Sequence, residues 1–150
     1  MCIRDSGIVL PAIAMTSDKD QCSFLNETGR CSIHMFRPGF CRLFPLGRVY
    51  DGTGFSYFLQ TGQCKKEHLA KVKVRQWINI PELKRYEQFV CDWHYFLKDL
   101  AKTSQGLSPE LIKTLHSYIL KVFYLTPYQD GSDFYDQFYM RLNDAKKLFL

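Results

Sequence analysis

The chain has 150 residues, of which 46% are hydrophobic and 15% aromatic, and its formal net charge is +5. This length and composition predict one folded domain with a moderate core and exclude a disordered chain. The charge is too small to indicate a dedicated nucleic-acid binder, so we do not expect a nucleic-acid partner. No apolar run approaches the roughly 18 to 20 residues that span a bilayer, so we expect no membrane-spanning segment.

The first six residues, MCIRDS, are similar to the translated end of a sequencing adapter. We therefore expect residues 1–6, with Cys2, to be an artefact, the natural N-terminus to be missing, and residues 7–150 to form a single domain. The alternative is a natural start followed by an apolar segment, 7–15, that imitates a signal peptide. That segment is short and interrupted by Pro11, so we expect a cytoplasmic, bacterial-type protein whose thiols stay reduced and favour metal over disulfides.

The stretch 21–64 contains four of the six cysteines, and its glycines and prolines break every long helical run. Cys22 and Cys31 flank a turn at 26–29, which predicts a small hairpin with the two cysteines on paired strands. Cys41 follows Arg37, Pro38 and Gly39 and precedes Pro45, so it is expected on a rigid, proline-bracketed element. A second hairpin, 48–50 with 55–59 across the turn DGTG, leads the chain to Cys64.

After Cys64 the composition becomes helical. The pattern predicts a short helix over 69–77, where the valines also permit a strand, and longer helices over 81–102, 108–124 and 133–150. Their apolar residues recur at three- and four-residue steps and are expected to face the core. The inward positions on the three long helices are Leu83, Tyr86, Phe89, Val90, Trp93, Phe96, Leu97, Leu100, Leu111, Ile112, Leu115, Tyr118, Ile119, Val122, Phe123, Phe134, Tyr135, Phe138, Leu142, Ala145 and Phe149.

Three polar positions on these helices fall away from the apolar stripes. Cys91 lies opposite the stripe of its helix, which predicts a surface thiol outside any site. His94 and His116 lie at stripe edges and are expected to be interfacial and solvated. The resulting fold class is α+β: an irregular cysteine-rich segment with short β-hairpins packed on a helical C-terminal half.

The segment 21–64 buries too little apolar area to offset a backbone entropy of about 1 to 2 kcal/mol per residue. Thiolates of Cys22, Cys31, Cys41 and Cys64 are suitable ligands for zinc or for an iron–sulfur cluster, and sulfur coordination does not distinguish the two. The alternatives are inert buried thiols, which pack as small hydrophobic groups, and disulfides. The residues alone leave metal ligation by these four cysteines and both alternatives open.

Neighbouring residues offer further roles. His34 and His68 lie close in sequence to Cys31 and Cys64, but a histidine in such a place is more often a polar surface residue than a ligand. Arg37 and Arg42 bracket Cys41 and either donate hydrogen bonds toward thiolate sulfur or form salt bridges to a carboxylate such as Glu27 or Asp51.

The basic group after Cys64 lacks a second basic stripe beside it, so it indicates a solvated face and not a nucleic-acid groove. Its members are Lys65, Lys66, Lys71, Lys73 and Arg75.

The sequences CSFLNETGRCSIH, RPGFCRLFPLG and QTGQC, which contain the four cysteines, resemble the YkgJ-type cysteine cluster family, a zinc- or iron-chelating domain. The resemblance covers about the first half of the chain and implies metal binding by these cysteines. Family members carry an earlier cysteine group of the CxxCxxCC kind, which this sequence lacks, so we expect a fragment that lost it.

A related branch contains flagellin lysine methylases with an iron–sulfur cluster, so a lysine N-methylase relative is one alternative function. No glycine-rich nucleotide-binding loop follows a predicted strand, so the residues do not decide whether the chain is an enzyme. A metal-free interaction module is another alternative. The leading hypothesis is a protein that holds zinc or an iron–sulfur cluster with cysteine thiolates.

Overall fold

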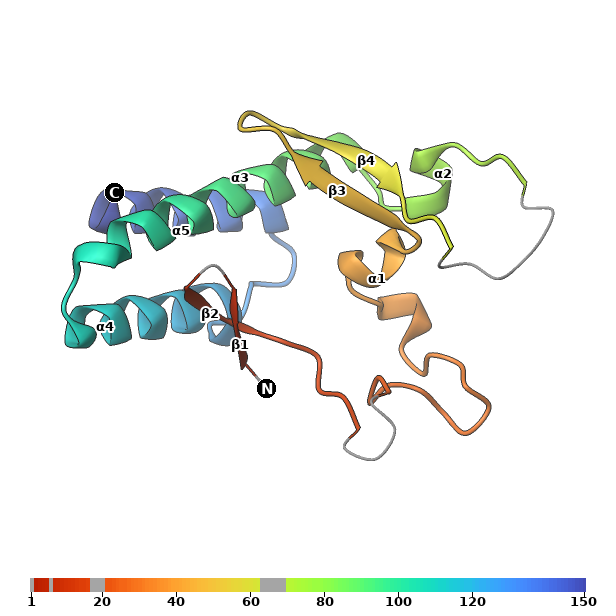
Figure 1. Ribbon diagram of the computed structural model, residues 1–150, viewed down its shortest axis with the longest axis horizontal. Helices are drawn as coiled ribbons and strands as arrows, with labels where there is room; N and C mark the ends of the chain where they lie inside the picture. The colour runs from red at the N-terminus through yellow and green to blue at the C-terminus, as the bar shows by residue number, and fades with distance from the viewer. Residues whose placement is uncertain (1, 6, 17–20, 63–69) are drawn as a thin grey trace. The chain divides into compact units, whose positions relative to one another are not determined.

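The computed structural model describes residues 2–5, 7–16, 21–62 and 70–150, with only the backbone at 2–5. Its fold is α+β, as predicted, with helices in most of the second half and two separate two-stranded antiparallel sheets in the described part of the chain (Figure 1). The chain divides into two compact units, Met1–Ser23 with Asp92–Leu150, and Phe24–Cys91. Each unit is described by itself.

The first unit begins with a short hairpin. Strand β1, Cys2–Asp5, pairs antiparallel with β2, Ile8–Pro11, with Asp5 opposite Ile8. The Ile8 side chain is fully buried. Beside it, His116 Nε2 lies 3.1 Å from the carbonyl oxygen of Gly7.

Helices supply the rest of the first unit. They are the second half of α3, Leu83–Thr103, then α4, Pro109–Leu120, continued by a π-helical turn Lys121–Leu125, and α5, Phe134–Phe149. A 3-10 turn at Ser104–Gly106 follows α3.

The two later helices start where their capping residues predict. Ser108 Oγ accepts a hydrogen bond from the backbone N–H of Leu111, and an Asp133 carboxylate oxygen accepts one from that of Asp136. Both are N-caps, which satisfy amide groups that the first helical turn leaves without a partner.

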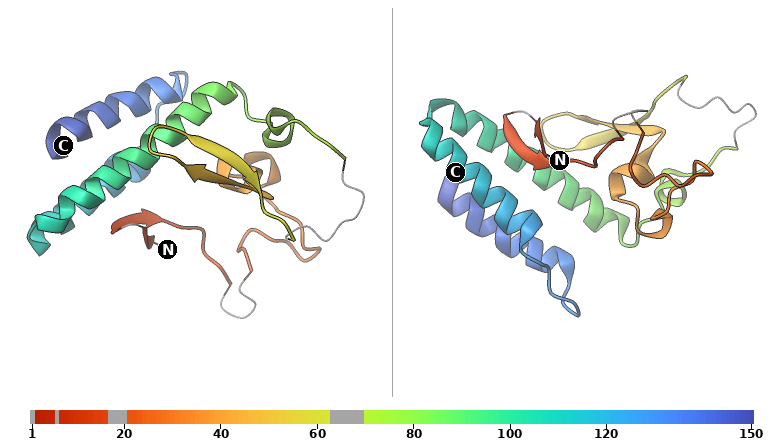
Figure 2. Two further views of the ribbon diagram at one scale, coloured as in Figure 1. Left: turned by 45° about the horizontal axis from the view of Figure 1, so that its top comes forward. Right: turned by 90° about the horizontal axis from the view of Figure 1, so that it is seen from below.

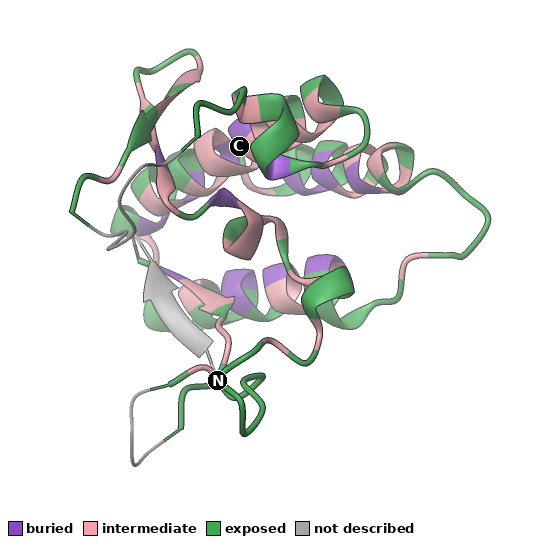
Figure 3. Ribbon diagram, turned by 90° about the vertical axis from the view of Figure 1, so that its right-hand side faces the viewer, coloured by how far each residue is buried: buried purple, intermediate pink, exposed green. Residues whose placement is uncertain are grey.

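The core of this unit is aromatic. The Trp93 ring centroid lies 4.6 Å from that of Phe123 and 5.8 Å from that of Phe138, so α3, the π-helical turn and α5 meet at one cluster. Buried positions form bands on the helices with exposed positions between them (Figure 3). The buried apolar side chains here are Ile8, Phe96, Leu100, Leu115, Ile119, Phe123, Phe138, Leu142 and Ala145.

Two positions expected to face inward do not. Leu111 is 54% exposed and Phe134 is 40% exposed. Both lie in the first turn of their helix.

Arg141 of α5 holds the end of the preceding helix. Its guanidinium donates to the carbonyl oxygens of Val122, Thr126 and Pro127 at 2.6, 2.9 and 2.8 Å. The same group lies 3.9 Å from the centroid of the Tyr128 ring, a close cation–π contact. One side chain therefore satisfies carbonyls that a helix C-terminus leaves without partners.

The second unit consists of short elements. Helix α1, Gly39–Leu43, is followed by β3, Leu46–Tyr50, and β4, Phe55–Leu59; then come α2, Val74–Ile78, and the first half of α3. The β3–β4 hairpin has Tyr50 opposite Phe55 and is visible from two further directions in Figure 2. The predicted DGTG turn is confirmed: Asp51 Oδ1 accepts from the backbone N–H groups of Thr53 and Gly54.

The side chain of Arg48 connects the β3–β4 hairpin to α3 through contacts with aromatic rings. The Arg48 guanidinium lies 5.1 Å from the centroid of Phe55, 5.8 Å from that of Tyr57 and 5.4 Å from that of Tyr86, and it donates to the Tyr86 hydroxyl. The Tyr57 hydroxyl donates to Glu87 Oε1 at 3.0 Å. Phe55 and Tyr57 of the hairpin therefore pack within the fold, whereas Phe58 is 44% exposed.

Helices α1 and α2 also lie side by side. The Trp77 indole N–H donates to the carbonyl oxygen of Phe44 at 3.0 Å, and Ile78 is fully buried. A cis peptide bond joins Phe44 to Pro45.

Two helix starts differ from the sequence prediction. Pro81 does not open α3, because Glu82 adopts a left-handed conformation with φ of 50° and the helix begins at Leu83. Helix α2 begins only at Val74, because Lys73 is still extended. None of the helices in the described ranges is both long and apolar enough to cross a membrane.

Candidate metal centre

Cys22 belongs to the first unit and is half-buried. It forms an isolated antiparallel bridge with Met15, and the neighbouring Ser23 N–H donates to the carbonyl oxygen of Ala14 at 3.2 Å. Paired strands carrying Cys22 and Cys31 were expected here, whereas the structure has two isolated bridges, Met15 with Cys22 and Leu25 with Cys31.

Cys31 belongs to the second unit, is also half-buried, and bridges to Leu25. The predicted turn before it is present. Asn26 Oδ1 accepts from the backbone N–H groups of Thr28 and Arg30, at 3.1 and 2.9 Å, which fixes the turn by an Asx-type interaction. The residues around Cys31 thus have defined backbone positions without extended strands.

Cys41 lies in the middle of α1 and is half-buried. Its backbone N–H donates to the carbonyl oxygen of Pro38 at 2.9 Å. The helix is only five residues long, with Pro38 at its N-cap and Phe44 at its C-cap. The proline-bracketed element predicted for Cys41 is present as this short helix.

The two arginines that bracket Cys41 differ in their surroundings. Arg42 donates to three backbone carbonyl oxygens: Nη2 to Met35 at 3.0 Å, Nε to Arg37 at 3.4 Å and Nη1 to Asn79 at 3.5 Å. Arg37 has a buried Nε with no hydrogen-bond partner among the described residues. Neither forms the salt bridge to Glu27 or Asp51 that was one of the two alternatives, within that same set of residues.

The histidines divide as follows. His34 lies exposed in the 3-10 turn His34–Phe36, and His94 is half-buried with its ring 5.1 Å from that of Tyr95. His116 was expected to be solvated, but its side chain is only 9% exposed, because the turn at Gly7 covers it. No local pattern marks this burial, since the covering residue lies far away in the sequence.

The prediction for Cys91 is also wrong. It is 9% exposed, and its Sγ lies 3.8 Å from the carbonyl oxygen of Thr53. The β3–β4 hairpin covers the side of α3 opposite the apolar stripe, so this helix is buried on more than one side. The sequence signal that was missed is the hairpin itself, whose alternating aromatic residues need a surface to pack against.

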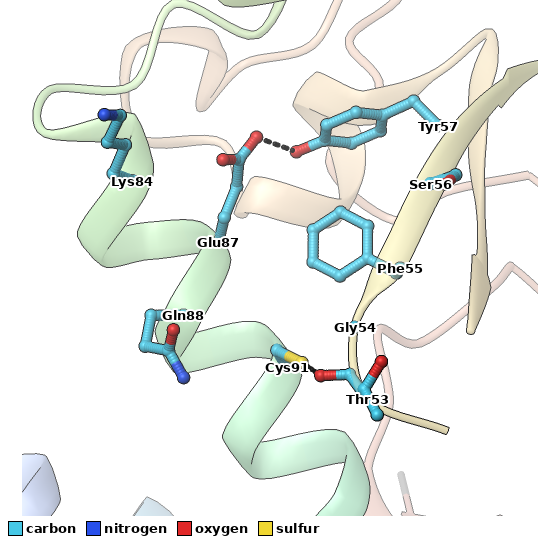
Figure 4. Close-up of a pocket in the computed structure, with 9 residues that line it drawn as sticks. All are labelled: Thr53, Gly54, Phe55, Ser56, Tyr57, Lys84, Glu87, Gln88 and Cys91. Atoms are coloured by element: carbon cyan, nitrogen blue, oxygen red, sulfur yellow. Dashed lines mark hydrogen bonds between the residues drawn. The ribbon is translucent and has the colours of Figure 1, made fainter. Parts of the chain in front are cut away.

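A cleft of about 610 Å³ opens where this hairpin meets α3 (Figure 4). Figure 4 shows Glu87 pointing to the Tyr57 hydroxyl across the cleft and Cys91 pointing to the Thr53 carbonyl. Desolvation, and then the hydrogen bond to Glu87, raise the pKa of Tyr57 to about 12. Tyr57 and Glu87 thus contact each other in this cleft, and so do Cys91 and the Thr53 carbonyl.

The donor chemistry of the first half fits a thiophilic metal. Cys22, Cys31 and Cys41 form no disulfide with one another in the structure. Within residues 2–5, 7–16, 21–62 and 70–150, no three or more His, Cys, Asp or Glu side chains are grouped so that they could hold a metal ion. Cys64 and His68 lie outside the described residues, and Cys22 belongs to a different unit from Cys31 and Cys41, so the four-cysteine site stays a prediction.

Comparison with known proteins gives one match. No curated protein and no solved structure matches the chain. Residues 10–73 match the model of the CxxCxxCC family, whose description is "Putative zinc- or iron-chelating domain". This match confirms the resemblance found in the sequence.

Proposed function

We propose that this protein binds zinc or an iron–sulfur cluster through the thiolates of Cys22, Cys31, Cys41 and Cys64. The observation that carries the proposal is the extent of the family match, which spans all four cysteines and ends before Cys91. Thiolate sulfur is a ligand for both kinds of centre. A reducing compartment such as the cytoplasm suits this chemistry, because thiols remain available there.

The packing of the second unit supports a structural role for the metal. Among its described residues, the buried hydrophobic side chains are Leu43, Ile78 and Cys91, a small set for a segment with short helices and one hairpin. A thin core offsets little of the chain entropy lost on folding. A bound metal supplies cross-links between distant points of such a segment, and its binding free energy adds to folding.

Each of the three described cysteines proposed as ligands lies in a segment with a defined backbone conformation. Cys41 is held by α1, Cys31 by the Asn26 turn, and Cys22 by its bridge to Met15. Cysteine ligands bind as thiolates, so metal binding releases protons and is expected to weaken at acidic pH.

The test is the metal content of the full 150-residue chain, purified without oxygen. We expect zinc or iron in an amount close to that of the protein, and the visible absorption of a sulfur-to-iron charge transfer identifies the cluster if iron is found. Serine replacements of Cys22, Cys31, Cys41 and Cys64, one at a time, should lower the metal content, because serine oxygen is a poor substitute for thiolate.

Cys91→Ser is the matched control and should keep the metal, because Cys91 lies outside the family match. Absence of zinc and iron from the unaltered chain would overturn the proposal. Full retention of metal by the four ligand variants would do the same.

A further inference from the structure

We propose that the cleft between β4 and α3 binds an extended, carboxylate-bearing segment of a partner protein, which adds a third strand to the β3–β4 sheet. One wall of this cleft is β4 and the other is α3 (Figure 4). The residues that carry the inference all belong to the second unit. The inference goes beyond metal binding and does not depend on it.

Two hydrogen bonds determine which residues of β4 pair with β3 through their backbone. At the turn, the backbone N–H of Asp51 donates to the carbonyl oxygen of Gly54 at 3.3 Å. At the other end of the hairpin, the backbone N–H of Gln60 donates to the carbonyl oxygen of Pro45 at 2.9 Å. Hydrogen-bonded pairs of an antiparallel ladder alternate with non-hydrogen-bonded pairs, so every second residue of β4 directs its backbone groups away from β3.

The outer edge of β4 therefore has a regular row of donors and acceptors. By the register, Ser56 and Phe58 direct their backbone groups to β3. Phe55, Tyr57 and Leu59 direct theirs away from it, and no other described residue hydrogen-bonds to these backbone groups. Because the groups recur at every second residue, the partner that matches them is another extended chain.

Strand β4 also lacks the features that usually prevent an edge strand from pairing. Its sequence, FSYFL, contains no charged residue and no proline, and both are common means of protecting an edge. The opposite edge of the sheet is different, because β3 contains Arg48 and the carbonyl oxygen of Leu46 accepts from the Gln60 side chain at 3.2 Å. We therefore expect the added strand at β4.

The cleft has the size of a short extended segment. Its volume is about 610 Å³. From Lys84 to Cys91, α3 rises by about 10 Å at roughly 1.5 Å per residue, and an extended chain covers that length in about three residues. The hydrogen bond from Tyr57 to Glu87 and the contact of Cys91 with Thr53 hold the two walls beside each other without a bound segment.

The charges in the cleft favour a segment with a carboxylate. Glu87 already accepts a hydrogen bond from Tyr57. Lys84, one turn earlier on α3, is exposed, and its ammonium group has no ion-pair or hydrogen-bond partner among the residues that the structure describes. A second copy of this chain is a poorer occupant, because its own β4 has no carboxylate to place beside Lys84.

The first measurement is the hydrogen exchange of single backbone amides in the full chain, followed by NMR. Ser56 and Phe58 should exchange slowly, because their amides are bonded within the ladder. Phe55, Tyr57 and Leu59 should exchange about 10-fold faster. Equal rates at all five positions would contradict the alternation and overturn the proposal.

A phage-displayed library of random seven-residue peptides then supplies the probe, and the selected peptides are synthesised. A bound peptide should slow exchange at Phe55, Tyr57 and Leu59 by about 10-fold and leave Ser56 and Phe58 nearly unchanged. N-methylation of alternate peptide amides, those that face β4, should lower the affinity about 10-fold through loss of a hydrogen bond. N-methylation of the intervening amides is the control and should have little effect.

Lys84→Gln tests the carboxylate on the bound segment. It should lower the affinity for the selected peptides about 2- to 5-fold, as expected for an exposed ion pair, and this difference should shrink at high salt. Lys113→Gln removes an exposed lysine from α4 in the other unit and is the matched control, which should bind as the unaltered chain does.

Four results would each overturn the proposal. They are failure of the library to yield a binder, binding that leaves exchange at Phe55, Tyr57 and Leu59 unchanged, equal affinity of Lys84→Gln and the unaltered chain, and a dimer in sedimentation that protects these amides without peptide. The last result would identify a second copy as the occupant. Metal content is measured separately, so none of these results bears on the metal proposal.

Discussion

Tyr57 shows how one contact links an aromatic hairpin to a helix. Its ring packs beside Arg48 and its hydroxyl donates to Glu87, so the neutral phenol is favoured in the folded state. Desolvation is the main cause, and the Glu87 contact the second, of a pKa raised to about 12. The unfolded chain has a tyrosine pKa close to 10.

The sign of the resulting pH dependence follows from linkage. A group that holds its proton more tightly when folded stabilises the protein below pH 10, and this contribution is lost as the pH rises from about 10 to 12. We expect the free energy of unfolding, measured by urea titration, to fall over this window by less in Tyr57→Phe than in the unaltered protein. Equal slopes in the two proteins would contradict the assignment.

Cys91 gives a second prediction at this scale, because its burial distinguishes it from the half-buried Cys31 and Cys41. In the metal-free native protein, we expect an alkylating reagent to modify Cys91 about 10-fold more slowly than the other two, since reaction requires the open state. Mass spectrometry of peptides measures each rate. In urea the three rates should converge; rapid modification of Cys91 in the native protein would show that its cover is absent.

Among elements, the end of α4 depends on Arg141. Three carbonyls lose their charged donor in Arg141→Met, and we expect the free energy of unfolding to fall by about 2 to 3 kcal/mol. Arg141→Lys keeps a charge near the Tyr128 ring and should lose less. Chemical denaturation of both variants tests this, and a Met variant as stable as the Lys variant would show that the carbonyls find other partners.

The elements also show which features local sequence predicts. Ser108 with Pro109, Asp133, and the DGTG turn act within a few residues, and the structure has a cap or turn at each. Caps and turns form between backbone groups that are close in sequence, so a short segment is enough to predict them.

Non-local packing is where sequence reasoning fails. His116 is covered by Gly7 and Cys91 by the turn at Thr53, and neither partner is predictable from helical periodicity alone. The cysteine site has the same character. Its residue types are readable from the sequence, and so is the resemblance to a family, but whether four sulfur atoms meet depends on packing between segments far apart in the chain.

At the scale of the whole molecule, the two units differ in how they are stabilised. The first has a cluster of aromatic rings around Trp93, and the second has a thin described core and, by our proposal, a metal. A ligand at 100 times its dissociation constant stabilises a folded protein by about 2.7 kcal/mol.

Removing the metal with a chelator should therefore affect one unit more than the other. We expect hydrogen exchange to accelerate at 24–62 and 70–78 while α4 and α5 keep their protection, as mass spectrometry of peptides will measure. Uniform acceleration across the chain would indicate a single cooperative unit, and no change would contradict a stabilising metal.

The positions of the two tryptophans allow fluorescence to follow each of the two units separately. Trp77 hydrogen-bonds to Phe44 in the second unit and is 46% exposed, whereas Trp93 stacks among rings of the first. Because the chain has two tryptophans, replacing either with phenylalanine leaves a single tryptophan, in a known unit, that can be excited at wavelengths where the tyrosines do not absorb. Emission from Trp77 alone then reports on the cysteine-rich half in real time, and emission from Trp93 alone reports on the helices.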